Sequence, residues 1–226
     1  MVVDFGPAGC DDYCNERYGH DRAKLKSCID ICNKVSEAVE ECLGKRVDNY
    51  SKYVTNCDLI RKRRFKKGDG KGIAGLYVFF DHDKVYYVGE TDDMIRRVGN
   101  EHCNAHIAGS KYVARFLIYH LLTGDDIYEN INDGRGKLRV IPSVKSVKEI
   151  VEEVKKVVKE ADGYIKEVLM REIGVQGIFM VICEELRGGE KRSLRKSLEK
   201  CIVERLEKAG LGPILNYEVG NEDDKA

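Results

Sequence analysis

Two tripeptides, Gly75-Leu-Tyr77 and Tyr87-Val-Gly89, place a pair of tyrosines ten residues apart, and both side chains can take part in proton chemistry. Ten residues after Tyr87 comes Arg97, and His102 follows five residues later. Arginine is always charged and offers a planar fork to phosphate oxygens. A free tyrosine has a pKa of about 10, so a basic role requires help from Arg97 or from a metal. Histidine can assist by relaying a proton.

A carboxylate and an amide complete this set nearer the C-terminus. Glu204 lies in a predicted helix, and Asn216 follows twelve residues later, with Pro213 three residues before it. One glutamate can hold Mg²⁺, which typically takes one or two carboxylates and keeps its waters. The asparagine can fix geometry through hydrogen bonds. Such residue types suit phosphodiester hydrolysis, which needs an activated water and compensation of charge in the transition state.

The order and spacing of these residues resemble the GIY-YIG nuclease family. The resemblance covers residues 73–217, with an insertion near 123–175. It implies an endonuclease that hydrolyses DNA phosphodiester bonds with one Mg²⁺ (or Mn²⁺) ion and a tyrosine-assisted water. The implied catalytic residues are Tyr77, Tyr87, Arg97, His102, Glu204 and Asn216, with Glu204 as the metal ligand.

Each of these residues also has an ordinary structural interpretation. Tyrosine is common in strands, and Tyr86 competes with Tyr87 for the catalytic position. Glu204 lies at the flank of the apolar helix face, and it competes with Glu199 and Glu207, which are expected to be surface charges. The nuclease interpretation therefore depends on the residues taken together.

One departure from the family pattern concerns the residue after the second glycine. Some family members have lysine there, whereas this chain has Glu90, and an acid cannot stabilise a phosphate. The alternative function is a non-catalytic module that retains the fold and binds nucleic acid or another partner. An RNA-directed nuclease is a third interpretation.

The formal net charge is zero, so a nucleic-acid partner requires a local basic surface. The segment Arg61–Lys67 has six basic residues and no acid. We interpret it as a DNA-positioning arm, because phosphate contacts position a protein without reading sequence. A solvated linker explains the pattern equally well. The expected DNA contacts are Arg61, Arg63, Arg64, Lys66, Lys67 and Arg96.

Six of the nine cysteines fall in the first 57 residues. Two pairs have helical spacing and can meet across a helical hairpin: Cys10 with Cys14, and Cys28 with Cys32. These four fit a structural Zn²⁺ site or two disulfides. We favour disulfides, with a third between Cys42 and Cys57, since the lysine-rich and glutamate-rich composition is typical of hyperthermophiles. Buried thiols are expected for the rest: Cys103, Cys183 and Cys201.

Hydrophobic periodicity predicts an α/β fold, in which a small, mainly antiparallel three-stranded sheet is flanked by helices. Strands are expected at 76–80, 84–88 and 177–183, and helices at 22–44, 92–102, 110–122 and 193–209. The insertion contains a predicted strand at 137–141 and a helix from 146. We divide the chain into a Cys-rich helical segment (1–58), a basic linker (59–72), the nuclease-like domain (73–217) and an acidic tail (218–226).

Composition and segment lengths indicate a globular protein. Apolar residues make up 42% of the chain and charged residues 35%. No run approaches the roughly 18 apolar residues of a membrane span, and the acidic N-terminus is not typical of a secretory signal. We therefore expect a cytoplasmic protein with no membrane partner.

Overall fold

Four antiparallel strands form the centre of the molecule. The computed structural model describes residues 9–62, 73–106, 110–123, 164–212 and 215–216. The strands run in the order β1-β4-β2-β3. Their bounds are β1 (Ser51–Asn56), β2 (Gly75–Phe80), β3 (Val85–Thr91) and β4 (Gly177–Ile182).

The predicted α/β class and antiparallel sheet are confirmed, but the expected count of three strands is wrong. The additional strand, β1, belongs to the N-terminal segment that was expected to be helical. It pairs with β4 from Ser51 opposite Ile182 to Asn56 opposite Gly177. Because its partner lies far away in the chain, local periodicity did not reveal it.

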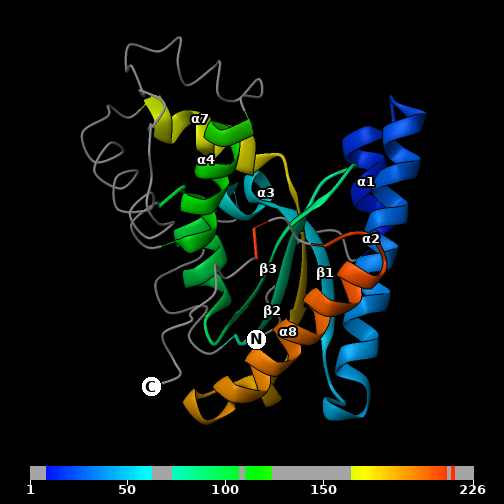
Figure 1. The fold of residues 1–226 in the computed structure, drawn as a ribbon, viewed down its shortest axis with the longest axis vertical. Helices are drawn as coiled ribbons and strands as arrows, with labels where there is room; N and C mark the ends of the chain where they lie inside the picture. The colour runs from blue at the N-terminus through cyan, green and yellow to red at the C-terminus, as the bar shows by residue number, and fades with distance from the viewer. Residues whose placement is uncertain (1–8, 63–72, 107–109, 124–163, 213–214, 217–226) are drawn as a thin grey trace.

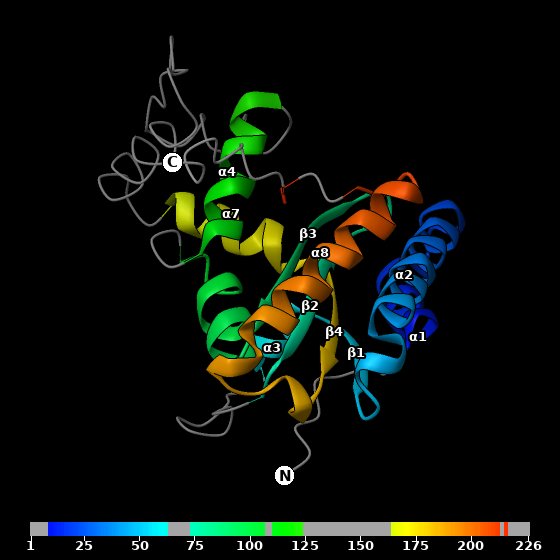
Figure 2. The same cartoon turned by 60° about the horizontal axis from the view of Figure 1, so that its bottom comes forward.

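Helices cover both faces of the sheet (Figures 1 and 2). One face packs against α1 (Cys10–Tyr18), α2 (Arg22–Leu43) and α8 (Arg192–Lys208). The other packs against α3 (Cys57–Lys62), the π-helix η2 (Ile95–His102), α4 (Lys111–Thr123) and α7 (Tyr164–Gly174). Short 3₁₀ turns complete the described elements: η1 (Gly44–Arg46), η3 (Glu184–Leu186) and η4 (Gly189–Lys191).

Strand β2 supplies both cores because successive side chains point to opposite faces. Tyr77 and Phe79 face η2 and α4, whereas Leu76, Val78 and Phe80 face the side of α1, α2 and α8. All six residues of β2 are buried, which explains its continuous apolar sequence.

The main predicted helices and the β2–β3 hairpin are confirmed. The helix expected at 92–102 is a π-helix in its second part, a geometry that is rare and often found at functional sites. The strand and helix expected at 137–161 lie outside the described residues, and α7 follows them. Among the described residues, no helix is both long and apolar enough to cross a membrane.

Disulfides join the N-terminal segment to itself and to the rest of the fold. Cys10 bonds to Cys32 and Cys14 to Cys28, so α1 and α2 are linked as the favoured interpretation predicted, and these sulfurs are not available to Zn²⁺ as thiolates. Disulfides persist in oxidising compartments and in hyperthermophile cytosols. A cytoplasmic location therefore stays a prediction.

The expected bridge between Cys42 and Cys57 is wrong. Cys42, at the end of α2, bonds to Cys201 of α8, and Cys57, at the start of α3, bonds to Cys103 beyond η2. Packing of α2 against α8, and of α3 against η2, brings these cysteines together, so the pairing does not follow from proximity in sequence. Cys183 is a buried free thiol, as expected.

Candidate active site

The β2–β3 hairpin brings the two tyrosines of the tripeptides together. Phe79 pairs with Tyr87 and Tyr77 with Gly89, and the ring centroids of Tyr77 and Tyr87 are 6.2 Å apart. A register shift beside Phe79 leaves Tyr86 as an extra residue. The Tyr86 hydroxyl instead donates to Asp81 Oδ2 at 2.6 Å, so Tyr87 is the tyrosine that faces Tyr77.

Gly89 is required by the position of the Tyr77 ring, which lies across the opposite strand. A Cβ at residue 89 would be 2.4 Å from both Cζ and Oη of Tyr77. Atoms other than hydrogen do not approach so closely without a bond. The glycine of the second tripeptide therefore has a packing reason that is independent of any resemblance.

His102, the last residue of the π-helix η2, lies beside Tyr77. The Tyr77 hydroxyl lies 2.8 Å from His102 Nε2, and His102 Nδ1 lies 2.6 Å from Ser110 Oγ. Ser110 Oγ also accepts a hydrogen bond from the amide of Val113 in the first turn of α4. Tyr77, His102 and Ser110 thus form a buried hydrogen-bonded chain. Sequence reasoning missed Ser110, although serine before a helix is a recognisable cap.

A disulfide and a hydrogen bond from α3 fix the C-terminal end of η2. The Cys57–Cys103 disulfide attaches to the residue after His102, and Arg61 Nη1 donates to the carbonyl oxygen of Cys103 at 2.7 Å. Arg61 also forms an ion pair with Asp58. Arg61 therefore has internal partners in this structure, and its expected contact with DNA stays a prediction. The other expected contacts of the basic segment lie outside the described residues: Arg63, Arg64, Lys66 and Lys67.

Burial is the largest cause of the pKa shifts in this cluster. It raises the pKa of Tyr77 well above the ordinary value, and Tyr87 adds to the shift. Burial and the negative charge of Glu199 raise the pKa of Tyr87 to about 12. Burial and the positive charge of Arg97 lower the pKa of His102 to about 3. At neutral pH both tyrosines are protonated and the histidine is neutral.

Two arginines of η2 share one carboxylate. Arg97 Nη1 lies 2.5 Å from Glu101 Oε2, and Arg96 pairs with the other oxygen of the same group. The Arg97 side chain is one-third exposed, and its charge acts on Tyr77, Tyr87 and the histidine. Its charge therefore acts on the tyrosine cluster from a partly exposed position.

Among the carboxylates, that of Glu199 acts most strongly on the pKa of both tyrosines, and that of Glu90 acts less. Glu199 is 13% exposed, and its charge raises the pKa of both Tyr77 and Tyr87. The Glu204 side chain is 54% exposed, and its Oε1 lies 3.9 Å from Lys200 Nζ. Five helical residues separate the two glutamates by about 140° around α8. The structure thus brings Glu199, and not the Glu204 expected from the sequence, into electrostatic contact with the tyrosines, and the role of Glu204 stays a prediction.

Asn216 binds the backbone of the edge strand β3. Its Oδ1 accepts from the amide of Val88 at 2.6 Å, and its Nδ2 donates to the carbonyl of Val88 at 2.8 Å. The amide of Leu215 donates to the carbonyl of Tyr86. These bonds hold β3, so the effect of Asn216 on the site is structural. Pro213 lies outside the described residues.

Glu90 has a buried partner. Its Oε2 accepts from Arg195 Nε at 2.7 Å, and Arg195 is 3% exposed. Arg195 also donates to the carbonyls of Leu186 and Gly188. The acid that departs from the family pattern is therefore paired with a buried cation of α8, although its charge still contributes to the raised pKa of both tyrosines.

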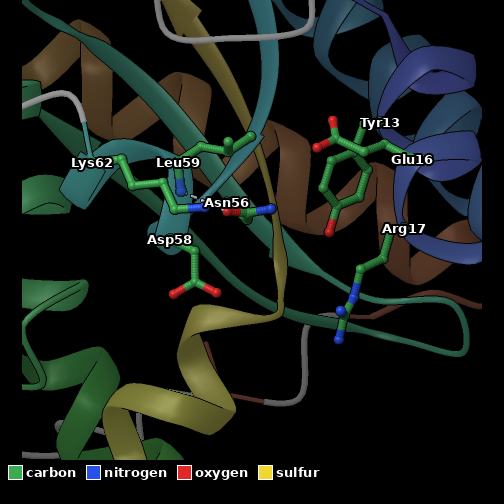
Figure 3. Close-up of a pocket in the computed structure, with 7 residues that line it drawn as sticks. All are labelled: Tyr13, Glu16, Arg17, Asn56, Asp58, Leu59 and Lys62. Atoms are coloured by element: carbon green, nitrogen blue, oxygen red, sulfur yellow. Dashed lines mark hydrogen bonds between the residues drawn. The ribbon is translucent and has the colours of Figure 1, made fainter.

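Two other features of the described residues are separate from the tyrosine cluster. Asp81, His82 and Asp83 lie close enough to share a cation, but they form the turn of the β2–β3 hairpin. A cavity of about 170 Å³ lies between α1 and α3 (Figure 3). None of its lining residues belongs to the predicted catalytic set: Tyr13, Glu16, Arg17, Asn56, Asp58, Leu59 and Lys62.

Comparison of the chain with protein-family models, with curated proteins and with solved structures finds no match.

Proposed function

We propose that the protein is a divalent-metal-dependent endonuclease that hydrolyses DNA phosphodiester bonds. The observation that carries this proposal is the convergence of Tyr77, Tyr87, Arg97 and His102 with the carboxylate of Glu199. The β2–β3 hairpin and the η2 helix that follows it supply four of these groups, and α8, far away in the chain, supplies Glu199.

Glu199 is the residue that would hold the metal. Its carboxylate is largely buried and close enough to both tyrosines to raise their pKa values. A single hard oxygen donor beside a substrate phosphate fits the way in which proteins bind Mg²⁺. A bound Mg²⁺ supplies charge for the phosphoryl oxygens and lowers the pKa of water.

The remaining groups act on the water and the phosphate. Arg97 faces solvent and balances the negative charge that develops on the phosphoryl group. The Tyr77 hydroxyl orients the attacking water, and His102 orients that hydroxyl through the 2.8 Å bond. Because the pKa of His102 is about 3, the histidine is a weak base until a phosphate anion approaches and raises that pKa.

A matched pair of variants tests the assignment. Supercoiled, branched and single-stranded DNA are incubated with the full chain in Mg²⁺ or in EDTA. We expect Glu199→Gln to lower metal-dependent cleavage by roughly 10²–10³-fold, in line with the loss of one transition-state contact. Glu204→Gln, the same change on the same helix, should retain the activity.

The opposite pattern would show that Glu204 is the metal ligand and that the geometric argument is wrong. Salt-sensitive DNA binding without cleavage of any substrate would favour the non-catalytic binding module.

A further inference from the structure

Lys196 bridges two carboxylates beside the tyrosine cluster. Its Nζ lies 2.6 Å from Glu199 Oε2 and 3.6 Å from Glu90 Oε1. Glu90 also pairs with Arg195, the neighbour of Lys196 in α8. The bridge therefore involves the carboxylate that we assign to the metal.

The two carboxylates depend on Lys196 to different extents. Glu90 has a second cation, since its other oxygen lies 2.7 Å from the buried Arg195. Lys196 itself is 53% exposed, so its long side chain can leave the bridge without a large cost of dehydration or unpacking. Departure of the ammonium would leave Glu90 paired with Arg195 and would remove one positive charge from Glu199 Oε2.

We propose that Lys196 is a displaceable counter-ion of Glu199, which competes with the divalent cation for that carboxylate and so weakens metal loading in the absence of substrate. The proposal rests on the assignment of Glu199 as the metal ligand. An ammonium ion on a carboxylate oxygen opposes the binding of a metal ion to the same group, because their like charges repel.

The charges of the group support this exchange. Glu90, Arg195, Lys196 and Glu199 together carry no net charge. A divalent cation added to this neutral group creates a positive excess, and a DNA phosphate balances it. Metal and substrate should therefore bind more tightly together than either does alone. Competition by Lys196 raises the Mg²⁺ concentration that is needed to occupy Glu199 in the absence of DNA.

Calorimetric titration of the full chain with Mg²⁺, without DNA, tests the proposal. We expect Lys196→Gln to bind Mg²⁺ about 1.4- to 5-fold more tightly, since a half-exposed ion pair is worth roughly 0.2–1 kcal/mol. Lys196→Arg keeps the charge and should retain the native affinity. Lys200→Gln removes a lysine of the same helix that pairs with the exposed Glu204, and it is the matched control.

Equal affinity of Lys196→Gln and Lys200→Gln would overturn the counter-ion proposal. A merely structural role of Lys196 would not tighten metal binding, so an increase in affinity supports competition. Glu199→Gln distinguishes failure of the metal site from failure of the counter-ion proposal. Mg²⁺ binding that survives this change refutes Glu199 as the metal ligand. If the change abolishes Mg²⁺ binding, the affinities of the Lys196 variants decide the counter-ion proposal alone.

Discussion

Replacing Gly89 with alanine places a methyl group against the ring of Tyr77. The new Cβ would lie 2.4 Å from Cζ and Oη and 2.7 Å from Cε2. Ordinary contact begins near 3.4 Å, so the ring must retreat by about 1 Å, the difference between 3.4 and 2.4 Å. Because Tyr77 is 2% exposed and packs edge-on against Phe79, it has little space in which to retreat.

The cost of this change has two parts. Overpacking of a filled core costs about 1–3 kcal/mol. A displacement of about 1 Å is enough to break the 2.8 Å bond between Tyr77 and His102, which contributes roughly 1 kcal/mol. We expect Gly89→Ala to lower the free energy of unfolding by about 2–4 kcal/mol. If Tyr77 positions the water, cleavage should fall on the order of 100-fold.

Urea denaturation followed by circular dichroism measures the first effect, and plasmid cleavage measures the second. Gly189→Ala is the matched control, because Gly189 is exposed and a Cβ there meets nothing within 4 Å. In a Tyr77→Ala background the obstructing ring is gone, so the further change Gly89→Ala should cost little. Equal stability of Gly89→Ala and Gly189→Ala, or additive costs in this double-mutant cycle, would refute the reasoning.

Two further predictions concern His102 and its attachment. Folding lowers the pKa of His102 from 6.5 to about 3, so the unfolded chain binds a proton at this residue before the folded chain does as pH falls. The free energy of unfolding of the wild-type protein should therefore decrease by about 1.4 kcal/mol for each pH unit between about pH 6.5 and about pH 3. His102→Gln should lack this component, and parallel pH profiles of unfolding for the two proteins would contradict the shift. Replacing Cys57 and Cys103 by serine frees the end of η2 beside His102 and should reduce kcat, whereas the same change at Cys14 and Cys28 should not, when both are assayed below their melting temperatures. Equal losses of kcat would indicate a general effect of stability.

The hairpin and the main helices were predictable because their signals are local. Two apolar runs separated by Asp81-His-Asp83 form β2 and β3, and the apolar stripe from residue 22 forms α2. The spacing from Tyr87 to Arg97 and His102 was equally informative, since one hairpin and one following helix carry all these groups.

The cysteine partners and the fourth strand were less accessible to sequence reasoning. Within the α1–α2 hairpin, helical spacing was enough to favour the two disulfides that form. Beyond it, Cys42 bonds to Cys201 across 159 positions, and β1 pairs with β4 across a similar distance in the chain. Spacing does not specify such contacts, because they depend on how helices and strands pack.

By itself, the sequence determined the tyrosine pair, the arginine and the histidine of the candidate site, because short spacing on one hairpin and the next helix places them. Only the tertiary structure decided that Glu199, and not Glu204, lies beside the tyrosines, that Glu90 has Arg195 as its partner, and that Ser110 completes the chain through His102. Neighbouring turns of one helix offer several glutamates with similar local sequence. The rotation of α8 against the sheet selects one of them, and that rotation is set by packing between segments far apart in the chain.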